Sequence, residues 1–491
     1  MAADRLDLPN SGDAKLLEAL AQLQAARIAS VMYSVTWDWL APAEDGELRW
    51  EYLDALVGAT CGKTQLKVFL LLDIMRPPPW IFTRYPDCTA RDSGNREYRH
   101  LSWYHPQALE KAMETLEAVA KRLASRYSGC VRGMQPVLNN EYEAKFTQEY
   151  DSFQDYNVFA LAAYRRWLRQ QQPELDTLNV RWDTKFSSWA AVKPPRLQAG
   201  TVLGVEGDPR FWDWMQFRVE SGAEVLNRAC GVVKSAGLMC FHHTPEFFSV
   251  LDSMYGASLF KYLSASPNTD FIIMDSNFRT PYGTVMDPQK LRIYVGAAKP
   301  YGKPVYFEAA VERYNNMSLL VDGYKASLLA GAPNLGITNW LGRVDLGPGF
   351  VDALHGAGER ASACAATERV GVFIHLDSCN AWLGLQYAWA HRDPLHNFVE
   401  ALAHRLTAGS SGCGTDLEVH IELHRFHRAL PTFDRAVFVE PLVLYGGEEL
   451  RSYVAVKGRL DTIPHEVLRL PTNSSRGLRL LVIDDLRPSA R

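Results

Sequence analysis

The sequence predicts an α/β fold: a (β/α)8 TIM barrel over residues 1–360, followed by a smaller flavodoxin-like α/β domain over residues 361–491. Short apolar runs alternate with amphipathic stretches up to residue 340, as strands and helices do in such a barrel. The alternation restarts after residues 356–368, "GAGERASACAATE". The 491 residues are too many for one ordinary domain, but they suit a barrel of roughly 200 to 400 residues with a second domain.

Seven apolar runs before residue 341 have the length and β-branched content of strands buried on both faces of a parallel sheet. In chain order they are "IASVMYSVTW", "KVFLLLDIM", "CVRGMQPVLNN", "LMCFHHT", "TDFIIMD", "KPVYFE" and "NLGITNW". The first strand of the barrel is weak or missing, because "DRLDLPNSG" is short and polar. Either Leu6 to Leu8 pair weakly at the barrel seam or the chain starts late, and both readings stay open.

Amphipathic stretches between these runs predict the helices of the barrel. In "HPQALEKAMETLEAVAKRLASRY" the apolar side chains recur at near-helical spacing; they are Leu109, Met113, Leu116, Val119 and Leu123. Further predicted helices are "AKLLEALAQLQAARI", "NVFALAAYRRWLRQQQ", "RFWDWMQFRVESGAEVLNRACGVVKSAG" and "MSLLVDGYKASLLAG". Alternation of strand and helix at these lengths is typical of parallel sheets.

The region after residue 360 contains four further strand-like runs, "RVGVFIHLD", "DLEVHIEL", "RAVFVEPLVL" and "LRLLVIDD". "LHNFVEALAHRLTAG" and "EELRSYVAVKG" are predicted helices between some of them. This pattern predicts a small doubly wound or flavodoxin-like domain. No Gly-rich phosphate loop follows its first strand, so a nucleotide-binding role is weakly supported.

Composition narrows the classes of function. Hydrophobic residues make up 47% and charged residues 22%, as in a folded soluble protein. The net charge of -4, with no run of Lys and Arg longer than a pair, argues against a nucleic-acid partner. No window approaches about 18 consecutive apolar residues, so no membrane partner is expected. The N-terminus lacks the pattern of a secretory signal, which favours a cytoplasmic location.

The eight cysteines are scattered along the chain at positions 61, 88, 130, 230, 240, 364, 379 and 413. None are paired at metal-ligand spacing, so a structural zinc is not expected. Without a visible signal, the thiols are expected to be reduced and mostly buried.

Polar and aromatic residues end most of the apolar runs, where the chemistry of such barrels takes place. They are Trp37, Asp38, Asp73, Asn140, Glu141, His242, His243, Asp275, Glu308, Asn339 and Trp340. The two glutamates matter most, because two carboxyl groups facing one cleft can cleave a glycosidic bond. One group protonates the leaving oxygen while the other attacks the anomeric carbon or activates water.

Neighbouring side chains fit a sugar site. Asn140 offers a neutral donor for a sugar hydroxyl, and Trp37, Trp80 and Trp340 offer flat apolar faces for sugar rings. A single glutamate at a strand end is more often a cap or an ion-pair partner, and Trp80 alone is more often a core residue. His242 and His243 form a metal pair less readily than one polar and one core histidine, because adjacent strand residues point to opposite faces.

Several segments together resemble one known family. They are "PPPWIFTRYP", "SGNREYRH", "LNNEYEA", "YRRWLRQQQPELDTLNVRWDTKFSSWAAVKPPR" and "GKPVYFEAA", and the region from "RVGVFIHLDSCNAW" through "DRAVFVEPLVLYGGEELRSYVAVKG". Through them the chain resembles the β-galactosidases of glycoside hydrolase family 42, which are retaining enzymes on a (β/α)8 barrel. The C-terminal region resembles the trimerisation domain of that family, which implies a homotrimer.

The resemblance implies roles residue by residue. Glu141 matches the general acid/base, Asn140 its neighbour on the sugar, and Glu308 the nucleophile. Glu312 competes with Glu308, which is preferred because it directly follows the apolar run "PVYF". The implied partner is a β-galactoside or related oligosaccharide, and neither a metal nor an organic cofactor is required.

The chain departs from the family at sugar-contacting positions. Val31 stands where the family has an arginine, Ala41 and Pro42 replace Glu-Pro, and Asn315 and Asn316 occupy a region that often holds a tryptophan. The zinc-binding cysteine cluster of some members is also absent. These departures favour, as an alternative, a barrel that binds carbohydrate without turnover. A second alternative is an inverting hydrolase similar to β-amylase, which "VMYSVTWDWL" and "PDCTARDSGNREYRHLSW" also resemble.

Overall fold

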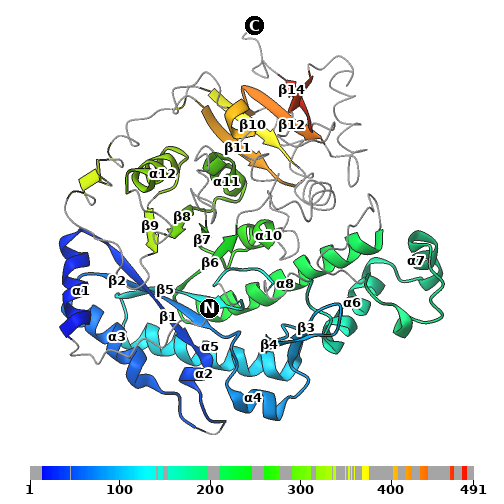
Figure 1. The fold of residues 1–491 in the computed structure, drawn as a ribbon, viewed down its shortest axis with the longest axis horizontal. Coiled ribbons are helices and arrows are strands. Elements are labelled where there is room, and N and C mark those ends of the chain that lie inside the picture. Colours follow the sequence, from blue (N-terminus) through cyan, green and yellow to red (C-terminus); the bar gives the residue numbers. More distant parts are fainter. Residues whose placement is uncertain are drawn as a thin grey trace. The chain divides into compact units, whose positions relative to one another are not determined.

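The computed structural model describes most of the chain up to residue 338 and shorter segments beyond it. The described residues are 14–44, 46–139, 142–146, 153–195, 209–245, 259–275, 290–310, 317–333, 335–338, 349, 352–353, 355–356, 359, 366, 368–374, 402–406, 415–422, 432–440, 465–468 and 478–483. They belong to two compact units (Figure 1). The first comprises residues 1–199, 208–243 and 266–270, and the second residues 200–207, 244–265 and 271–491.

A parallel sheet forms the centre of the first unit. Its strands are β1 (Ser30–Thr36), β2 (Lys67–Asp73), β5 (Val131–Val137) and β6 (Met239–Pro245), in that order. The register pairs Thr36 with Asp73 and Asp73 with Val137, so the carboxyl ends of three strands lie along one edge. The predicted strands at these positions are confirmed. The candidate first strand, Leu6 to Leu8, lies outside the described residues.

Helices connect the strands of this sheet, as expected for parallel neighbours. They are α3 (Trp50–Lys63), α5 (Pro106–Arg126) and α8 (Pro209–Ser235), and α1 (Ala14–Ala25) precedes β1. Further elements are α2 (Trp37–Leu40), α4 (Pro79–Arg84), α6 (Val158–Gln171), α7 (Leu175–Trp182) and η2 (Trp189–Ala191), with the antiparallel pair β3 (Thr89–Arg91) and β4 (Glu97–Leu101).

Helix α5 shows how its sequence produces its packing. The His105 side chain caps the helix by accepting a hydrogen bond from the Ala108 N–H at 3.1 Å, and Pro106 occupies the first turn, where no N–H is needed. The five apolar residues of the predicted stripe are all buried. Burial of each such side chain contributes about 1.5–3 kcal/mol, so the apolar stripe fixes the helix on the sheet.

Two disulfides join elements of the first unit, so the expectation of reduced thiols is wrong for four cysteines. Cys61 of α3 pairs with Cys130, and Cys230 of α8 pairs with Cys240 of β6. The fold brings their Cα atoms to 5.7 and 5.5 Å, a closeness that spacing in the sequence does not reveal. Cys88 is buried and free. The other three cysteines lie outside the described residues.

The second unit begins with another set of parallel strands. They are β7 (Phe271–Asp275), β8 (Val305–Ala310) and β9 (Leu335–Thr338), hydrogen-bonded in that order. Helix α10 (Leu259–Ala265) precedes β7, α11 (Leu291–Ala298) and η4 (Lys299–Tyr301) lead to β8, and α12 (Met317–Leu329) leads to β9. This repeated strand–helix–strand order is that of an α/β barrel segment.

A five-stranded sheet follows in the same unit. Its strands are β10 (Glu368–Phe373), β11 (Thr415–His420), β12 (Arg435–Glu440), β13 (His465–Leu468) and β14 (Leu478–Ile483), in the order β11-β10-β12-β14-β13. The four predicted strands are present, and β13 was not predicted. Strands β10, β11 and β12 are parallel, but β14 runs antiparallel to both of its neighbours. A flavodoxin-like domain and a boundary near residue 360 therefore stay predictions.

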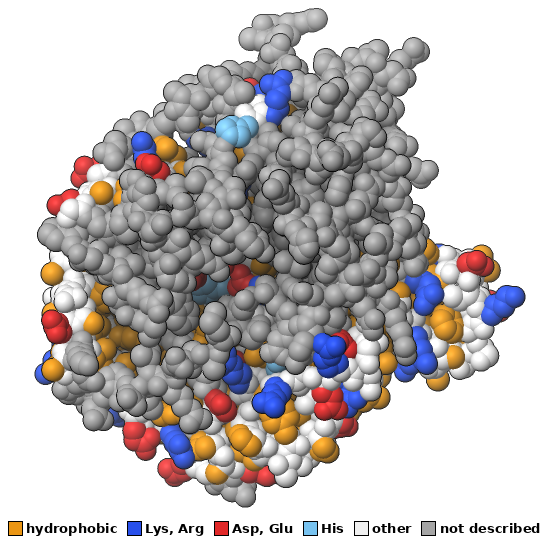
Figure 2. All heavy atoms as spheres, in the orientation of Figure 1, with side chains coloured by type: hydrophobic (Ala, Val, Ile, Leu, Met, Phe, Trp, Pro, Cys, Tyr) orange, Lys and Arg blue, Asp and Glu red, His pale blue; other side chains and the backbone are white. Residues whose placement is uncertain are grey.

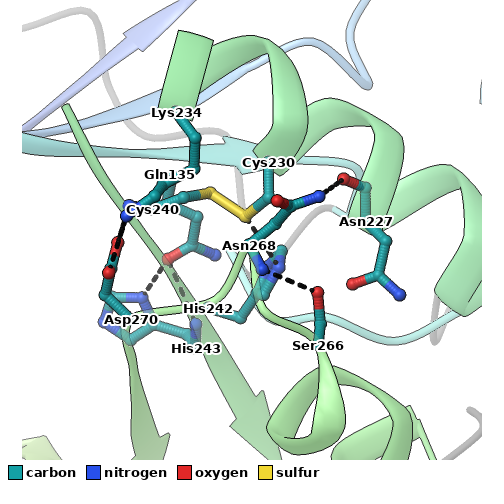
Figure 3. The surroundings of a disulfide bond; sticks show 10 residues. All are labelled: Gln135, Asn227, Cys230, Lys234, Cys240, His242, His243, Ser266, Asn268 and Asp270. Atoms are coloured by element: carbon teal, nitrogen blue, oxygen red, sulfur yellow. Dashed lines mark hydrogen bonds and ion pairs between the residues drawn. A yellow bond between two sulfur atoms is a disulfide. The ribbon is translucent and has the colours of Figure 1, made fainter. Parts of the chain in front are cut away.

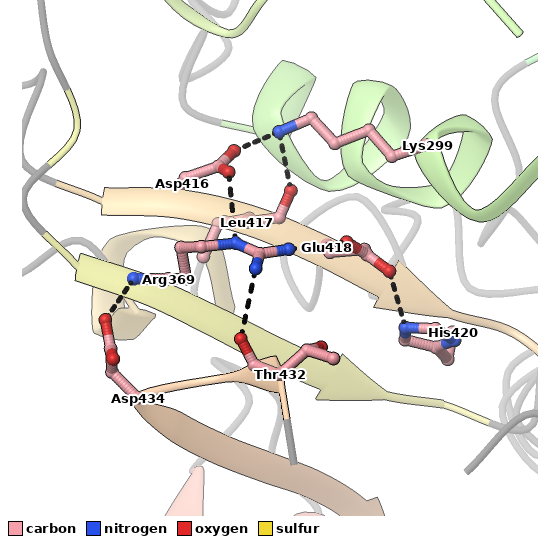
Figure 4. A network of polar contacts seen from close by, with 8 residues as sticks. All are labelled: Lys299, Arg369, Asp416, Leu417, Glu418, His420, Thr432 and Asp434. Atoms are coloured by element: carbon pink, nitrogen blue, oxygen red, sulfur yellow. Dashed lines mark hydrogen bonds and ion pairs between the residues drawn. The ribbon is translucent and has the colours of Figure 1, made fainter. Parts of the chain in front are cut away.

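Helix α11 and η4 pack against β11 (Figure 4). Lys299 forms an ion pair with Asp416 and donates to the Leu417 carbonyl at 2.9 Å. Gly296 lies so close to β11 that a Cβ there would stand 3.0 Å from the Leu417 oxygen. Glycine is needed at this position because the helix and the strand touch through their backbones.

Charges of both signs lie on the described part of the surface. On the face drawn in Figure 2, Lys and Arg side chains of the described residues are interspersed with Asp and Glu. Among the helices described, none is both long and apolar enough to cross a membrane.

Candidate active site

Only two of the five residues predicted to form the site are among the described residues. Asn140, Glu141 and Trp340 lie outside the described residues, as does the competing Glu312. Glu308 lies on β8 of the second unit, and Trp37 begins α2 of the first. The predicted roles of all five site residues stay predictions.

The chain on either side of Asn140 and Glu141 is held firmly. Before them, Asn139 is fully buried, and its Nδ2 donates to the Lys145 carbonyl at 3.1 Å. After them, the Tyr142 carbonyl accepts a hydrogen bond of 2.6 Å from Gln135 Nε2 on β5. The Tyr142 N–H also donates to the Asn139 carbonyl at 3.4 Å. Two buried amide side chains, those of Asn139 and Gln135, therefore hold the described residues on either side of this pair.

A buried ion pair follows directly. Glu143 and Lys145 are 7% and 2% exposed and pair with each other. The Ala144 N–H between them donates to the His243 carbonyl of β6 at 2.6 Å, which ties the turn to the sheet. The paired charge makes Glu143 a structural carboxylate rather than a second acid at the site. Sequence reasoning missed this pair, whose only local signal is a lysine two residues after a glutamate.

The two histidines of β6 take opposite roles, as the sequence indicated. The backbone N–H of His243 donates to Gln135 Oε1 at 3.1 Å, and its Nδ1 lies 2.5 Å from the same oxygen. His242 faces the core instead, and its Nε2 lies 3.2 Å from Cys230 Sγ (Figure 3). Burial, aided by His243, lowers the pKa of His242 to about 3, so this imidazole is neutral.

Asp73 ends β2 at the same edge of the sheet and is fully buried. Its Oδ1 accepts hydrogen bonds from the backbone N–H groups of Met75 and Arg76 at 3.1 and 3.3 Å. The Arg76 Nε lies 3.1 Å from Oδ2. Burial raises the pKa of Asp73 to about 7, although Arg76 and the hydrogen bonds act in the other direction. A carboxyl group of this kind titrates near neutral pH.

His100 of β4 adds a second perturbed group to this edge. It is 3% exposed, and burial together with the charge of Arg76 lowers its pKa to about 4. Sequence reasoning included Asp73 among the strand ends but did not single out Arg76 or His100. Perturbed groups gather at functional sites more often than elsewhere, which makes Asp73 and His100 candidates for a role at the site.

Trp37 is fully buried at the end of β1. Its ring makes an edge-to-face contact with Trp80 at 6.5 Å between centroids, and Trp80 Nε1 donates to the Ala41 carbonyl at 2.9 Å. Among the described residues, Trp37 Nε1 has no hydrogen-bond partner. A ring so enclosed supports a binding surface from beneath more readily than it presents a flat face to a sugar.

In the second unit, Glu308 lies on β8 and is partly exposed. It is in register with Asp275, the last residue of β7, and with Gly336 of β9. Residues in register on parallel strands point to the same face, so Asp275 and Glu308 are two carboxylates side by side.

Comparison with known proteins places this chain in a family. The model of the family described as "Beta-galactosidase", glycoside hydrolase family 42, matches residues 9–306, more than half of the chain. A curated relative, a β-galactosidase of Thermus thermophilus, is 32% identical over 232 residues. That match covers 44% of this chain and 33% of the relative, so the aligned part spans about a third of the relative's length.

Solved structures agree on the fold. A β-galactosidase from the haloarchaeon Halorubrum lacusprofundi has a TM-score of 0.63 at 18% identity, covering 82% of this chain and 64% of that one. The catalytic domain of a β-amylase from Paenibacillus polymyxa has a TM-score of 0.59 at 15% identity, covering 70% and 94%. The extent of the family match decides between them: this chain belongs to glycoside hydrolase family 42.

Proposed function

We propose that this protein is a retaining glycoside hydrolase of the β-galactosidase type, acting on a terminal β-glycosidic bond by double displacement. The observation that carries the proposal is the family match over residues 9–306, which includes the segment "LNNEYEA". The substrate class is a β-galactoside or a related oligosaccharide. A trimeric assembly is part of the same proposal and rests on the resemblance of the C-terminal region alone.

The proposed chemistry uses two glutamates. Glu141, protonated, donates its proton to the leaving oxygen, while ionised Glu308 attacks the anomeric carbon and forms a glycosyl-enzyme. Glu141 then takes a proton from water, which releases the sugar with its configuration retained. Asn140 donates to a sugar hydroxyl next to the reacting carbon. Neither step needs a metal or an organic cofactor.

The surroundings of the two glutamates support these roles. The described residues on either side of Glu141 are anchored, Asn139 by its bond to the Lys145 carbonyl and Tyr142 by the bond from Gln135, and anchored neighbours suit a proton donor that must act at a defined distance. Glu308 is partly exposed and has a glycine beside it on β9, which suits a nucleophile that must reach a carbon atom. Asp275, in register with Glu308, is the matched control for any substitution there.

The first experiment is hydrolysis of a panel of nitrophenyl α- and β-glycosides by the wild type and by Glu141→Ala, Glu308→Ala, Glu312→Ala and Asp275→Asn. Loss of β-galactoside turnover in the first two variants alone supports the proposed pair. Added azide should restore turnover in both, giving an α-glycosyl azide with Glu308→Ala and a β-glycosyl azide with Glu141→Ala. If Glu312→Ala lost turnover while Glu308→Ala kept full activity, Glu312 would be assigned as the nucleophile instead.

The β-amylase-like alternative predicts a different product. An inverting hydrolase acting on an α-glucan releases the opposite anomer from that of its substrate. The β-amylase catalytic domain has a similar fold at 15% identity, which supports fold and not activity. Proton NMR of the first sugar released separates the two mechanisms when its anomer is compared with that of the substrate. Retention gives the β-anomer from a β-galactoside, whereas inversion gives the β-anomer from an α-glucan.

The alternative of a carbohydrate-binding barrel without turnover rests on the departures at Val31 and Ala41. Val31 packs against the buried cluster of Leu20, Ala59 and Leu66 beside α1 and α3, so in this structure it is a packing residue. That placement weakens the inference from Val31 to lost activity. Sugar binding measured by calorimetry, with no product from any glycoside, would favour the binding protein over the enzyme.

A further inference from the structure

A cluster of metal-ligating side chains lies in the first unit, apart from the residues proposed for hydrolysis. Cys230 of α8 and Cys240 and His242 of β6 bring one donor atom each to within 4.8 Å of one another (Figure 3). Cys240 and His242 are two residues apart on a strand, so both side chains point to the same face. All three residues are fully buried.

The spacing of the donors is close to what zinc requires. Cys230 Sγ lies 3.2 Å from His242 Nε2, and the Cα atoms of the two cysteines are 5.5 Å apart. Zinc bonds of about 2.3 Å to sulfur and about 2.0 Å to nitrogen place tetrahedral donors roughly 3.5–4 Å apart. Opening the disulfide and moving the sulfurs apart by a small rotation of each side chain therefore gives a three-ligand site.

The backbone that carries these ligands is held in place. Asp270 accepts a hydrogen bond of 2.8 Å from the Cys240 N–H, and its own N–H donates to the Cys240 carbonyl at 2.7 Å. Lys234, one turn after Cys230 on α8, binds both oxygens of Asp270 at 2.8 Å. Helix and strand are thus tied together by a second set of contacts that does not depend on the disulfide.

His242 has no other polar role in the part of the chain that is described. Its Nδ1 is buried without a hydrogen-bond partner among those residues, and its Nε2 is directed at the sulfur of Cys230. A buried imidazole without ordinary partners is unfavourable and calls for an explanation. Coordination of a metal by Nε2 would give this ring a function.

We propose that, when the disulfide is reduced, Cys230, Cys240 and His242 bind a thiophilic divalent ion such as Zn²⁺, so that the pair exists either as a disulfide or as a zinc site. A phosphine reductant and water convert the disulfide into two thiols and a phosphine oxide. Zinc then displaces one proton from each thiol and binds the two thiolates and the imidazole. This proposal is independent of the proposed hydrolysis.

The test uses the full chain, reduced with a phosphine without oxygen, loaded with Zn²⁺, desalted and analysed for metal by mass spectrometry. One zinc per chain is expected for the wild type, none for Cys230→Ser, and at least tenfold weaker retention against a chelator for His242→Gln. The oxidised wild type should bind none. The matched control is Cys61→Ser with Cys130→Ser, which removes the other disulfide and should keep one zinc.

A second readout covers the case in which a variant fails to fold. In the reduced wild type, Zn²⁺ should protect Cys230 and Cys240 from alkylation at least tenfold, while Cys61 and Cys130 stay equally reactive with and without metal. Circular dichroism identifies any misfolded variant. The proposal is wrong if the reduced wild type keeps less than a tenth of a zinc per chain, or if zinc changes the alkylation of all four cysteines alike.

Discussion

Asp73→Asn offers a quantitative test of the electrostatics at the carboxyl edge of the first sheet. The asparagine keeps an oxygen that can accept from the Met75 and Arg76 N–H groups, which the Asp73 carboxylate now binds at 3.1 and 3.3 Å. It removes the group whose pKa burial raises from 3.8 to about 7. The substitution therefore isolates the titration from most of the packing.

The direction in which the unfolding free energy changes with pH follows from the direction of the pKa change. Because the folded pKa lies above the unfolded one, the folded protein binds more protons between about pH 4 and pH 7, and its stability falls as pH rises through that window. A difference of about three pH units corresponds to about 4 kcal/mol. Relative to the wild type, Asp73→Asn should gain about this much unfolding free energy from pH 4 to pH 8.

The assay is urea unfolding of both proteins at several pH values, followed by tryptophan fluorescence. Asp54→Asn is the control of opposite sign. Burial alone raises the pKa of Asp54, but hydrogen bonds from Arg122 and Tyr127 outweigh it and hold the pKa below its ordinary value. Asp54→Asn should thus lose stability relative to the wild type as pH rises to the ordinary carboxyl pKa of about 4, and change little above it, so the pH series extends below that value. If the difference in unfolding free energy between Asp73→Asn and the wild type stayed constant from pH 4 to pH 8, the raised pKa of Asp73 would be refuted.

Three further predictions concern stability, each measured by urea unfolding. Leu116→Ala, at a fully buried position of α5, should lower the unfolding free energy by about 2–5 kcal/mol, and a loss below 1 kcal/mol would contradict the packing. Gly296→Ala should cost about 1–3 kcal/mol, because its Cβ would stand 3.0 Å from the Leu417 oxygen; an unchanged urea midpoint would argue against that contact. Loss of the Cys61–Cys130 bridge, with its sequence separation of 69, should cost about 4 kcal/mol, and an unchanged midpoint under reduction would show that it is not formed.

Local patterns predicted the parts of the fold that depend on local physics. The stripe on α5 is buried as its spacing requires, and the apolar runs form β1, β2, β5 and β6. Strands β2, β5 and β6 are buried over most of their residues, as parallel strands covered on both faces are, whereas only Val35 of β1 is buried. Strand β13 escaped prediction because "HEVL" is short and carries two polar residues. Its place depends on pairing with β14, which no local pattern encodes.

The parts that sequence could not predict depend on contacts between distant residues. Arg218 is fully buried, with its guanidinium 4.4 Å from the Phe146 ring, although an arginine in a helix ordinarily faces water. The pair of Cys230 and Cys240 depends on the approach of α8 to β6. The raised pKa of Asp73 depends on how completely its neighbours cover it. By contrast, Glu141 and Glu308 could be proposed from the sequence, because they follow apolar runs and match the family's catalytic positions.

The most direct test of the proposed chemistry is to trap the glycosyl-enzyme. A 2-deoxy-2-fluoro-β-galactoside with a good leaving group slows the second step more than the first, so the covalent sugar accumulates and can be located by peptide mass spectrometry. We expect one fluorosugar per chain, on the peptide and residue of Glu308, and no labelling of Glu308→Ala. A label on Glu312, or hydrolysis of β-galactosides without any covalent sugar, would contradict the assignment of Glu308 as the nucleophile.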